Sequence, residues 1–137
     1  MGEPNPEKPF KLHGIELISF SIHPQPDREY PKGEFEFNIN QEQKTNDEKR
    51  IIIVFTSVTI RPSGKETILA SLSVACGFEF PFFEKIFKKN PAGIYLIPQD
   101  LSTSINRISI ATTRGILYSQ LRGTYLQGST IPILDIE

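Results

Sequence analysis

The first half of the chain carries the alternation of apolar and polar residues that predicts β-strands. Four segments show this alternation or a β-branched composition: residues 10–22, 34–40, 50–60 and 67–80. The third segment is β-branched almost throughout, which favours a central strand, and Gly14 predicts a bulge or bend in the first. The wholly polar residues 41–49 predict an exposed loop. Together these segments predict a four-stranded antiparallel β-meander.

In the second half of the chain the apolar spacing changes to three or four residues, which predicts helices. Residues 82–89 predict one or two amphipathic turns that form a short crossover helix. Two apolar tracks then predict a long helix from about Pro98: Leu101, Ile105, Ile108 and Thr112, and beside them Ile110, Ala111, Leu117 and Leu121. We expect Gly115 to weaken this helix and Gly123 or Gly128 to end it. The predicted fold is therefore α+β, with one long helix packed on the sheet.

Half of the ten phenylalanines fall between residues 78 and 87, where the predicted sheet ends. Each buried Phe side chain contributes about 1.5–3 kcal/mol, so these rings either fill the core or form a surface that binds something else. An apolar groove beside a sheet edge binds both the side chains and the backbone of an extended chain. The candidate groove residues are Phe78, Phe80, Phe82, Phe83, Phe87, Tyr95 and Leu96. We expect about half of them to be ordinary core.

The composition of 137 residues with a net charge of −1 indicates one globular domain. Residues 1–9 contain three prolines and predict a flexible arm, followed by a single domain over residues 10–137. The small net charge argues against binding of nucleic acid. The sequence contains neither a signal-peptide pattern nor an apolar run long enough to insert into a membrane, so we expect a cytoplasmic protein.

Residues that usually carry catalysis or bind metals occur here without the required spacing. His13 and His23 lack Cys or carboxylate partners at ligand spacing, and Cys76 stands in an apolar strand as a predicted buried, unreactive thiol. The segment Gly64-Lys65-Glu66-Thr67 is not a phosphate-binding loop, because Thr59 occupies the place of its first glycine. We therefore predict no metal, no cofactor and no enzyme activity.

Residues 101–134 contain no Asp, Glu or Lys, and their charges are the arginines at positions 107, 114 and 122. These arginines are spaced close to two helical turns apart, so they can share one helix face. The simplest interpretation is a solvated face, and the alternative is a surface for an acidic partner.

The order of these elements resembles the SecB family of protein-export chaperones. Val74-Ala75-Cys76-Gly77-Phe78-Glu79-Phe80 resembles the end of that family's fourth strand. A helix over residues 101–115 that finishes in Thr112-Thr113-Arg114-Gly115 resembles its first long helix, and Ile131-Pro132-Ile133-Leu134-Asp135-Ile136 is similar to the apolar segment beyond that helix. Two departures are visible. Leu101-Ser102 replaces the usual Phe-Pro pair, and the sequence stops at Glu137, before the family's second helix and its acidic tail, which contacts the SecA motor.

The resemblance implies an ATP-independent holdase that binds unfolded polypeptides or preproteins, either generally, for export with a SecA-like motor, or for one toxin–antitoxin client. It also implies a homo-oligomer, a dimer of dimers with long helices between two sheets. The residues expected to face a partner subunit are Ile105, Ile108, Ala111 and Thr112. Two alternatives from the residues themselves stay open: a sheet module with an internal pocket for a small apolar ligand, and an adaptor subunit with a fixed aromatic interface.

Overall fold

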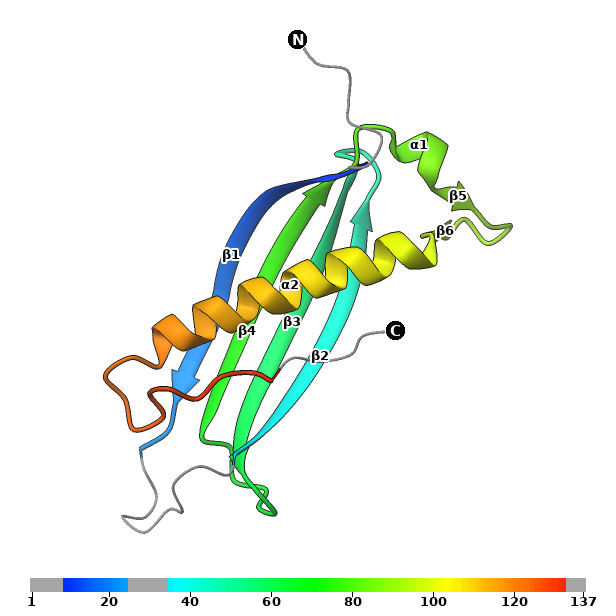
Figure 1. Ribbon diagram of the computed structural model, residues 1–137. Coiled ribbons are helices and arrows are strands. Elements are labelled where there is room, and N and C mark those ends of the chain that lie inside the picture. Colours follow the sequence, from blue (N-terminus) through cyan, green and yellow to red (C-terminus); the bar gives the residue numbers. More distant parts are fainter. Residues whose placement is uncertain (1–8, 25–34, 133–137) are drawn as a thin grey trace.

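The protein folds into a four-stranded antiparallel sheet crossed by one long helix, as the computed structural model of residues 9–24 and 35–132 shows (Figure 1). The elements in chain order are β1 (Lys11–Ile22), β2 (Phe35–Asn46), β3 (Ile51–Pro62), β4 (Ala70–Glu79), α1 (Phe83–Ile86), β5 (Lys88–Lys89), β6 (Tyr95–Leu96) and α2 (Gln99–Gln120). The predicted α+β class is confirmed. The predictions for the arm at residues 1–8, for Glu34 and for the apolar residues 133–136 lie outside the described residues.

The strand order in the sheet is β1-β4-β3-β2. Strands β2, β3 and β4 follow one another as a meander, with β3 in the central position that its β-branched composition predicts. Strand β1 departs from a simple four-stranded meander, because it pairs with β4 at the far side of the sheet. Residues 23–34 separate β1 from β2, and this connection is longer than the two to five residues of a typical hairpin loop. Both β1 and β2 are therefore edge strands.

The prediction of a loop over residues 41–49 is wrong for its first part, because β2 continues to Asn46. Its partner β3 begins at Ile51, and the two strands stay in register to the pair Asn46↔Ile51. A tight turn joins them, in which the backbone N–H of Lys49 donates to Asn46 Oδ1 over 3.2 Å. Arg50 closes this turn at a φ of 58°, in the left-handed region. The strand is thus continued by cross-strand pairing, although its side chains there are polar.

The core lies between the sheet and α2. Alternate side chains of β3 and β4 face the helix and are buried: Ile52, Val54, Val58, Ile60, Leu72, Val74, Cys76 and Phe78. From α2, Ile105, Ile110 and Leu117 are buried opposite them, and so is Leu121 directly after the helix. The residues of β4 are those that the alternation placed on one face, and that prediction is confirmed.

Both helices agree with the extents predicted for them. Helix α1 is a single turn from Phe83 to Ile86, and the lysines that follow it form β5 instead of a second turn. Helix α2 begins directly after Pro98 and runs through Gly115 to Gln120. Gly123, at a φ of 81°, follows its end. In the described part of the chain, neither helix combines the length and the apolarity needed to cross a membrane.

Candidate functional site

Four of the seven predicted groove residues are core residues in this chain. Phe78, Phe80, Phe83 and Phe87 are each at most 3% exposed. Their rings pack edge-on against one another, with centroids 4.8 Å apart for Phe80 and Phe87 and 4.5 Å for Phe83 and Phe87. They are buried because they pack against one another and against Phe10 and Tyr95, contacts that the spacing of the rings along the chain does not reveal. These rings fill space between themselves, and Phe83 also borders an open hollow of about 190 Å³ at the surface. That hollow is small and is lined by Arg50, Glu84 and Lys85 as well, so it does not favour the small apolar ligand of the alternative.

The other predicted groove residues lie at the surface, on the crossover between the sheet and α2. Phe82 is 40% exposed and Leu96 is 55% exposed, while Tyr95 is half-buried with its ring 4.9 Å from that of Phe83. Ile94, which the sequence analysis passed over, is the most exposed large apolar residue of the group at 62%. We call Phe82, Ile94 and Leu96 the crossover surface.

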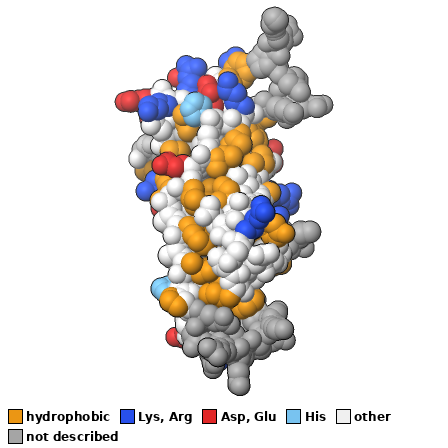
Figure 2. Space-filling view, turned by 90° about the vertical axis from the view of Figure 1, so that its left-hand side faces the viewer, with side chains coloured by type: hydrophobic (Ala, Val, Ile, Leu, Met, Phe, Trp, Pro, Cys, Tyr) orange, Lys and Arg blue, Asp and Glu red, His pale blue; other side chains and the backbone are white. Residues whose placement is uncertain are grey.

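A second apolar surface lies on strand β1 and was not predicted. Leu12, Ile15, Leu17 and Ile18 are between 40% and 50% exposed, and we call them the edge surface. Three of them pair with Phe78, Cys76 and Val74 of β4, whose buried side chains face α2, so they stand on the helix side of the sheet. Figure 2 shows hydrophobic side chains gathered along this side of the molecule. The sequence signal was available, since residues 10–22 contain more apolar residues than one buried face requires.

Two irregularities shape the edge surface. The register of β1 against β4 shifts between Leu12 and Gly14 and again between Leu17 and Ser19. The first shift lies next to the bend predicted at Gly14, and the second places Ile18 outside the regular ladder. Bulges of this kind raise the local twist and change the direction of side chains, and they are common on edge strands. As an edge strand, β1 also leaves backbone N–H and C=O groups on its outer side unpaired within the sheet.

The outward side of α2 is the third surface with apolar residues. Of the four residues predicted to face a partner subunit, Ile105 is fully buried against the sheet, and its proposed place in an interface is therefore wrong for this chain. Ile108 is 37% exposed, Ala111 is exposed and Thr112 is half-buried. Tyr118, 51% exposed, lies on the same outward side three turns from Ile108. We call Ile108, Ala111 and Tyr118 the helix surface.

The opposite edge of the sheet is polar. On β2, the side-chain amide of Gln41 donates to Asn106 O over 3.0 Å, and that of Gln43 donates to Asn106 Oδ1 over 2.9 Å and to Ser102 Oγ over 3.1 Å. These glutamines belong to the segment that was predicted to be a loop. Their hydrogen bonds fix α2 over β2 with specific geometry, because the amide of Gln41 has one acceptor on the helix and that of Gln43 has two.

Arg114 of α2 is hydrogen-bonded to the segment that follows the helix. Arg114 Nε donates to Ile131 O over 2.8 Å, and its NH2 group donates to Pro132 O over 3.1 Å. The prediction of a fully solvated arginine face is therefore wrong at this position. Because α2 continues to Gln120, the pair Arg114-Gly115 lies inside the helix and does not close it as in the resemblance to SecB.

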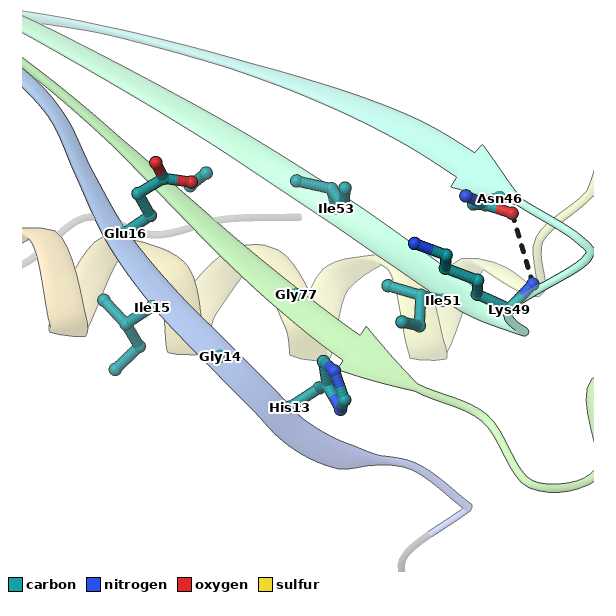
Figure 3. Close-up of a pocket in the computed structure, with 10 residues that line it drawn as sticks. His13, Gly14, Ile15, Glu16, Asn46, Lys49, Ile51, Ile53 and Gly77 are labelled. Carbon is teal, nitrogen blue, oxygen red and sulfur yellow. Dashed lines mark hydrogen bonds between the residues drawn. The ribbon is translucent and has the colours of Figure 1, made fainter.

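The face of the sheet that is turned away from α2 contains an open hollow of about 540 Å³. Figure 3 shows His13, Glu16 and Lys49 around it, with Ile51 and Ile53 at its base. The carboxylate and the ammonium group have opposite signs, so the hollow favours neither anions nor cations. Within residues 9–24 and 35–132, no three potential metal-ligating side chains lie together. This hollow offers contact area without chemistry that selects a ligand.

The single cysteine is buried under α2. Burial raises the pKa of the Cys76 thiol above its ordinary value, and hydrogen bonds with the hydroxyls of Ser109 and Thr112 offset part of this rise. A raised pKa keeps the thiol protonated and unreactive at neutral pH. The prediction that Cys76 is buried is confirmed.

Comparison with known proteins supports the resemblance at the level of the fold. No protein-family model matches the sequence. No curated protein matches it either. Among solved structures, the chain is similar to the SecB-like chaperone Rv1957 of Mycobacterium tuberculosis, solved in complex with a ChAD peptide from the Rv1956 HigA1 antitoxin. The TM-score is 0.59 at 14% sequence identity, over 91% of this chain and 90% of the other. The chain therefore has the fold of a SecB-like chaperone, as its element order predicts.

Proposed function

We propose that this protein is a SecB-like molecular chaperone that captures unfolded, apolar polypeptide segments without ATP. The observation that carries the proposal is β1, a 12-residue edge strand with four large apolar side chains at least 40% exposed. Contiguous exposed apolar residues on a sheet edge are a feature that soluble proteins normally avoid unless the edge binds something. The shared fold supports the same proposal, since its solved neighbour is a chaperone with a bound peptide.

The physical basis of capture is strand addition. An extended client segment pairs with the outer backbone groups of β1, while its apolar side chains cover the edge surface. Each half-exposed Leu or Ile side chain that is covered contributes about 1 kcal/mol, roughly half the value for complete burial. Such increments, offset by the entropy lost on ordering the client, give weak and reversible binding. Release then needs no chemical step, and hand-over to an export motor, the use that the resemblance implies, can follow.

We propose in addition that copies of this chain assemble through the helix surface. Ile108 and Tyr118 are exposed in the single chain, and Ala111 and Gly115 between them are small enough to allow a second helix to approach closely. Static light scattering in solution measures this directly. A mass corresponding to one chain at micromolar concentration would refute assembly.

The chaperone proposal is tested by the suppression of aggregation of a chemically denatured, slowly folding protein, followed by light scattering. We expect the double variant Ile15→Thr/Leu17→Thr to lose most of the protection, because threonine preserves strand propensity but removes apolar area. The matched control is Ile68→Thr, which changes an isoleucine of similar exposure (41%) outside the three surfaces. Circular dichroism confirms that both variants are folded.

Three results of these measurements would contradict or narrow the chaperone proposal. Undiminished protection by the double variant would show that β1 is not the capture surface. A wild-type protein that protects no general substrate but binds an antitoxin-derived peptide would limit the function to one dedicated client. A double variant that falls apart into smaller species would show that the edge surface joins subunits instead of binding clients.

A further inference from the structure

Three lysines stand beside the apolar side chains of the crossover surface. Lys85 Nζ lies 5.6 Å from the centre of the Phe82 ring. Lys88 pairs directly with Leu96 across the small β5–β6 sheet, so the two side chains lie on the same face of that sheet. Lys89 Nζ lies 4.9 Å from the ring of Tyr95. Ammonium groups and exposed apolar groups thus alternate over one part of the surface.

The positive charge of this region is not neutralised within the described part of the chain. The ion pairs seen there join Glu79 to Lys11 and His13, and Glu36 to Arg61, and the three crossover lysines take part in none of them. Two acidic residues belong to this region: Glu84 on α1, and Asp47, which accepts a hydrogen bond from the Tyr95 hydroxyl over 3.2 Å.

A small hollow provides a place where an added carboxylate can be bound. Its volume is about 190 Å³, and Arg50 and Lys85 line it together with Phe82 and Glu84. Arg50 is oriented by its turn, and its guanidinium donates to Pro81 O over 3.4 Å. The hollow therefore has a net positive charge, because Arg50 and Lys85 carry two positive charges and Glu84 carries one negative charge. The exposed ring of Phe82 lies beside these groups.

We infer that the crossover surface binds polypeptide segments in which Asp or Glu stands next to large apolar residues. This inference rests on the proposed function and adds a class of client to it. The aliphatic side chains Ile94 and Leu96, 62% and 55% exposed, select for apolar side chains. The lysines and Arg50 select for carboxylates by charge complementarity. Nucleic acid is the less suitable occupant, because its binding relies on base stacking along a continuous basic groove.

The experiment measures the binding of three fluorescently labelled synthetic peptides by anisotropy. The peptides share one apolar Phe/Leu/Ile core and differ in their flanking residues, which are Asp, Ser or Lys. We expect the Asp-flanked peptide to bind about two- to fivefold tighter than the Ser-flanked peptide at low salt, since one exposed ion pair contributes up to about that factor. The difference should shrink as salt is added.

A variant without two of the lysines tests whether the preference for the Asp-flanked peptide arises from the crossover surface. In Lys85→Gln/Lys88→Gln, which keeps Lys89 and Arg50, the preference for the Asp-flanked peptide should become clearly smaller than in the wild type. The matched control Lys44→Gln/Lys65→Gln removes the same charge from exposed lysines elsewhere and should retain the preference.

The inference is overturned if the wild type binds all three peptides equally, if the control variant loses the preference as well, or if a labelled single-stranded DNA binds more tightly than the Asp-flanked peptide. In each of these cases suppression of aggregation can persist, and the proposed chaperone function then stands. Loss of suppression in the wild type would instead refute the proposed function itself.

Discussion

Replacing Phe83 with alanine should destabilise the fold far more than the same change at its neighbour Phe82. Phe83 is 1% exposed, and its ring packs 4.5 Å from Phe87 and 4.9 Å from Tyr95. Truncation of such a ring leaves a cavity and removes two aromatic contacts, for an expected loss of about 3–5 kcal/mol. Phe82 is 40% exposed, so only part of its side chain is buried by folding. For Phe82→Ala we expect a loss of about 1 kcal/mol.

The measurement is urea-induced unfolding followed by far-ultraviolet circular dichroism, with the free energy of unfolding taken from the linear dependence on urea. An unchanged slope shows that both variants unfold from a similarly compact state. A small domain has a total stability of about 5–15 kcal/mol, so Phe83→Ala can leave too little folded protein to measure. The variant Phe83→Leu fills most of the space and should lose less, which keeps the comparison possible.

For peptide binding we expect the reverse order: the change at Phe82 should have the larger effect and the change at Phe83 the smaller one. Phe82→Ala removes exposed area from the crossover surface and should weaken peptide capture, whereas Phe83→Leu should leave capture intact at temperatures where it is folded. Equal loss of stability at both positions, or loss of capture in folded Phe83→Leu, would show that the assignment of core and surface on the crossover is incorrect.

Two further predictions concern the interior. Gln43→Ala removes two hydrogen bonds to α2 and leaves Asn106 Oδ1 without this donor, so the free energy of unfolding should fall by about 1–3 kcal/mol in urea, against less than about 0.5 kcal/mol for the exposed neighbour Glu42→Ala. Because the pKa of Cys76 is raised in the folded state, its thiol should react with an aromatic disulfide reagent only on unfolding. A raised pKa in the folded state means that the unfolded protein loses the thiol proton first as the pH rises. The free energy of unfolding should therefore be constant below about pH 8.5, as far as this thiol determines it, and should fall at higher pH; Cys76→Ala should not show this fall.

The elements were predictable where one face of a strand or helix is apolar and buried. The alternation in β4 follows directly from this burial and is confirmed, whereas the two apolar tracks of α2 are buried only in part, since Ile108 and Ala111 are exposed. The end of β2 was not predictable in this way, because Gln41 and Gln43 are half-buried against α2 and held there by hydrogen bonds. Periodicity of hydrophobic residues does not register a polar side chain whose partner lies about sixty residues further along the chain.

The candidate site was harder to predict than the fold, because exposure depends on which elements become neighbours. The phenylalanine cluster contains half of the chain's phenylalanines, yet four of its rings are buried against one another and against Phe10, whose ring centre lies 5.7 Å from that of Phe78 and 5.4 Å from that of Phe80. The apolar residues of β1 are less prominent in the sequence. They are exposed because β1 pairs with β4 at the end of the sheet, and α2 does not bury them.

The two edges of this sheet have different chemistry, and the difference indicates which edge binds other chains. On β2 the side chains that face away from α2 are polar or charged, among them Glu36, Glu42 and Lys44, and such residues oppose the addition of a further strand. The helix sides of the two edges differ as well: β2 is hydrogen-bonded to α2 through Gln41 and Gln43, whereas β1 presents the edge surface, which α2 does not bury. A sheet that is protected at one edge and apolar at the other adds a strand on one side alone. Binding through β1 therefore gives the added segment a defined place, next to the exposed side of α2, without requiring a particular client sequence.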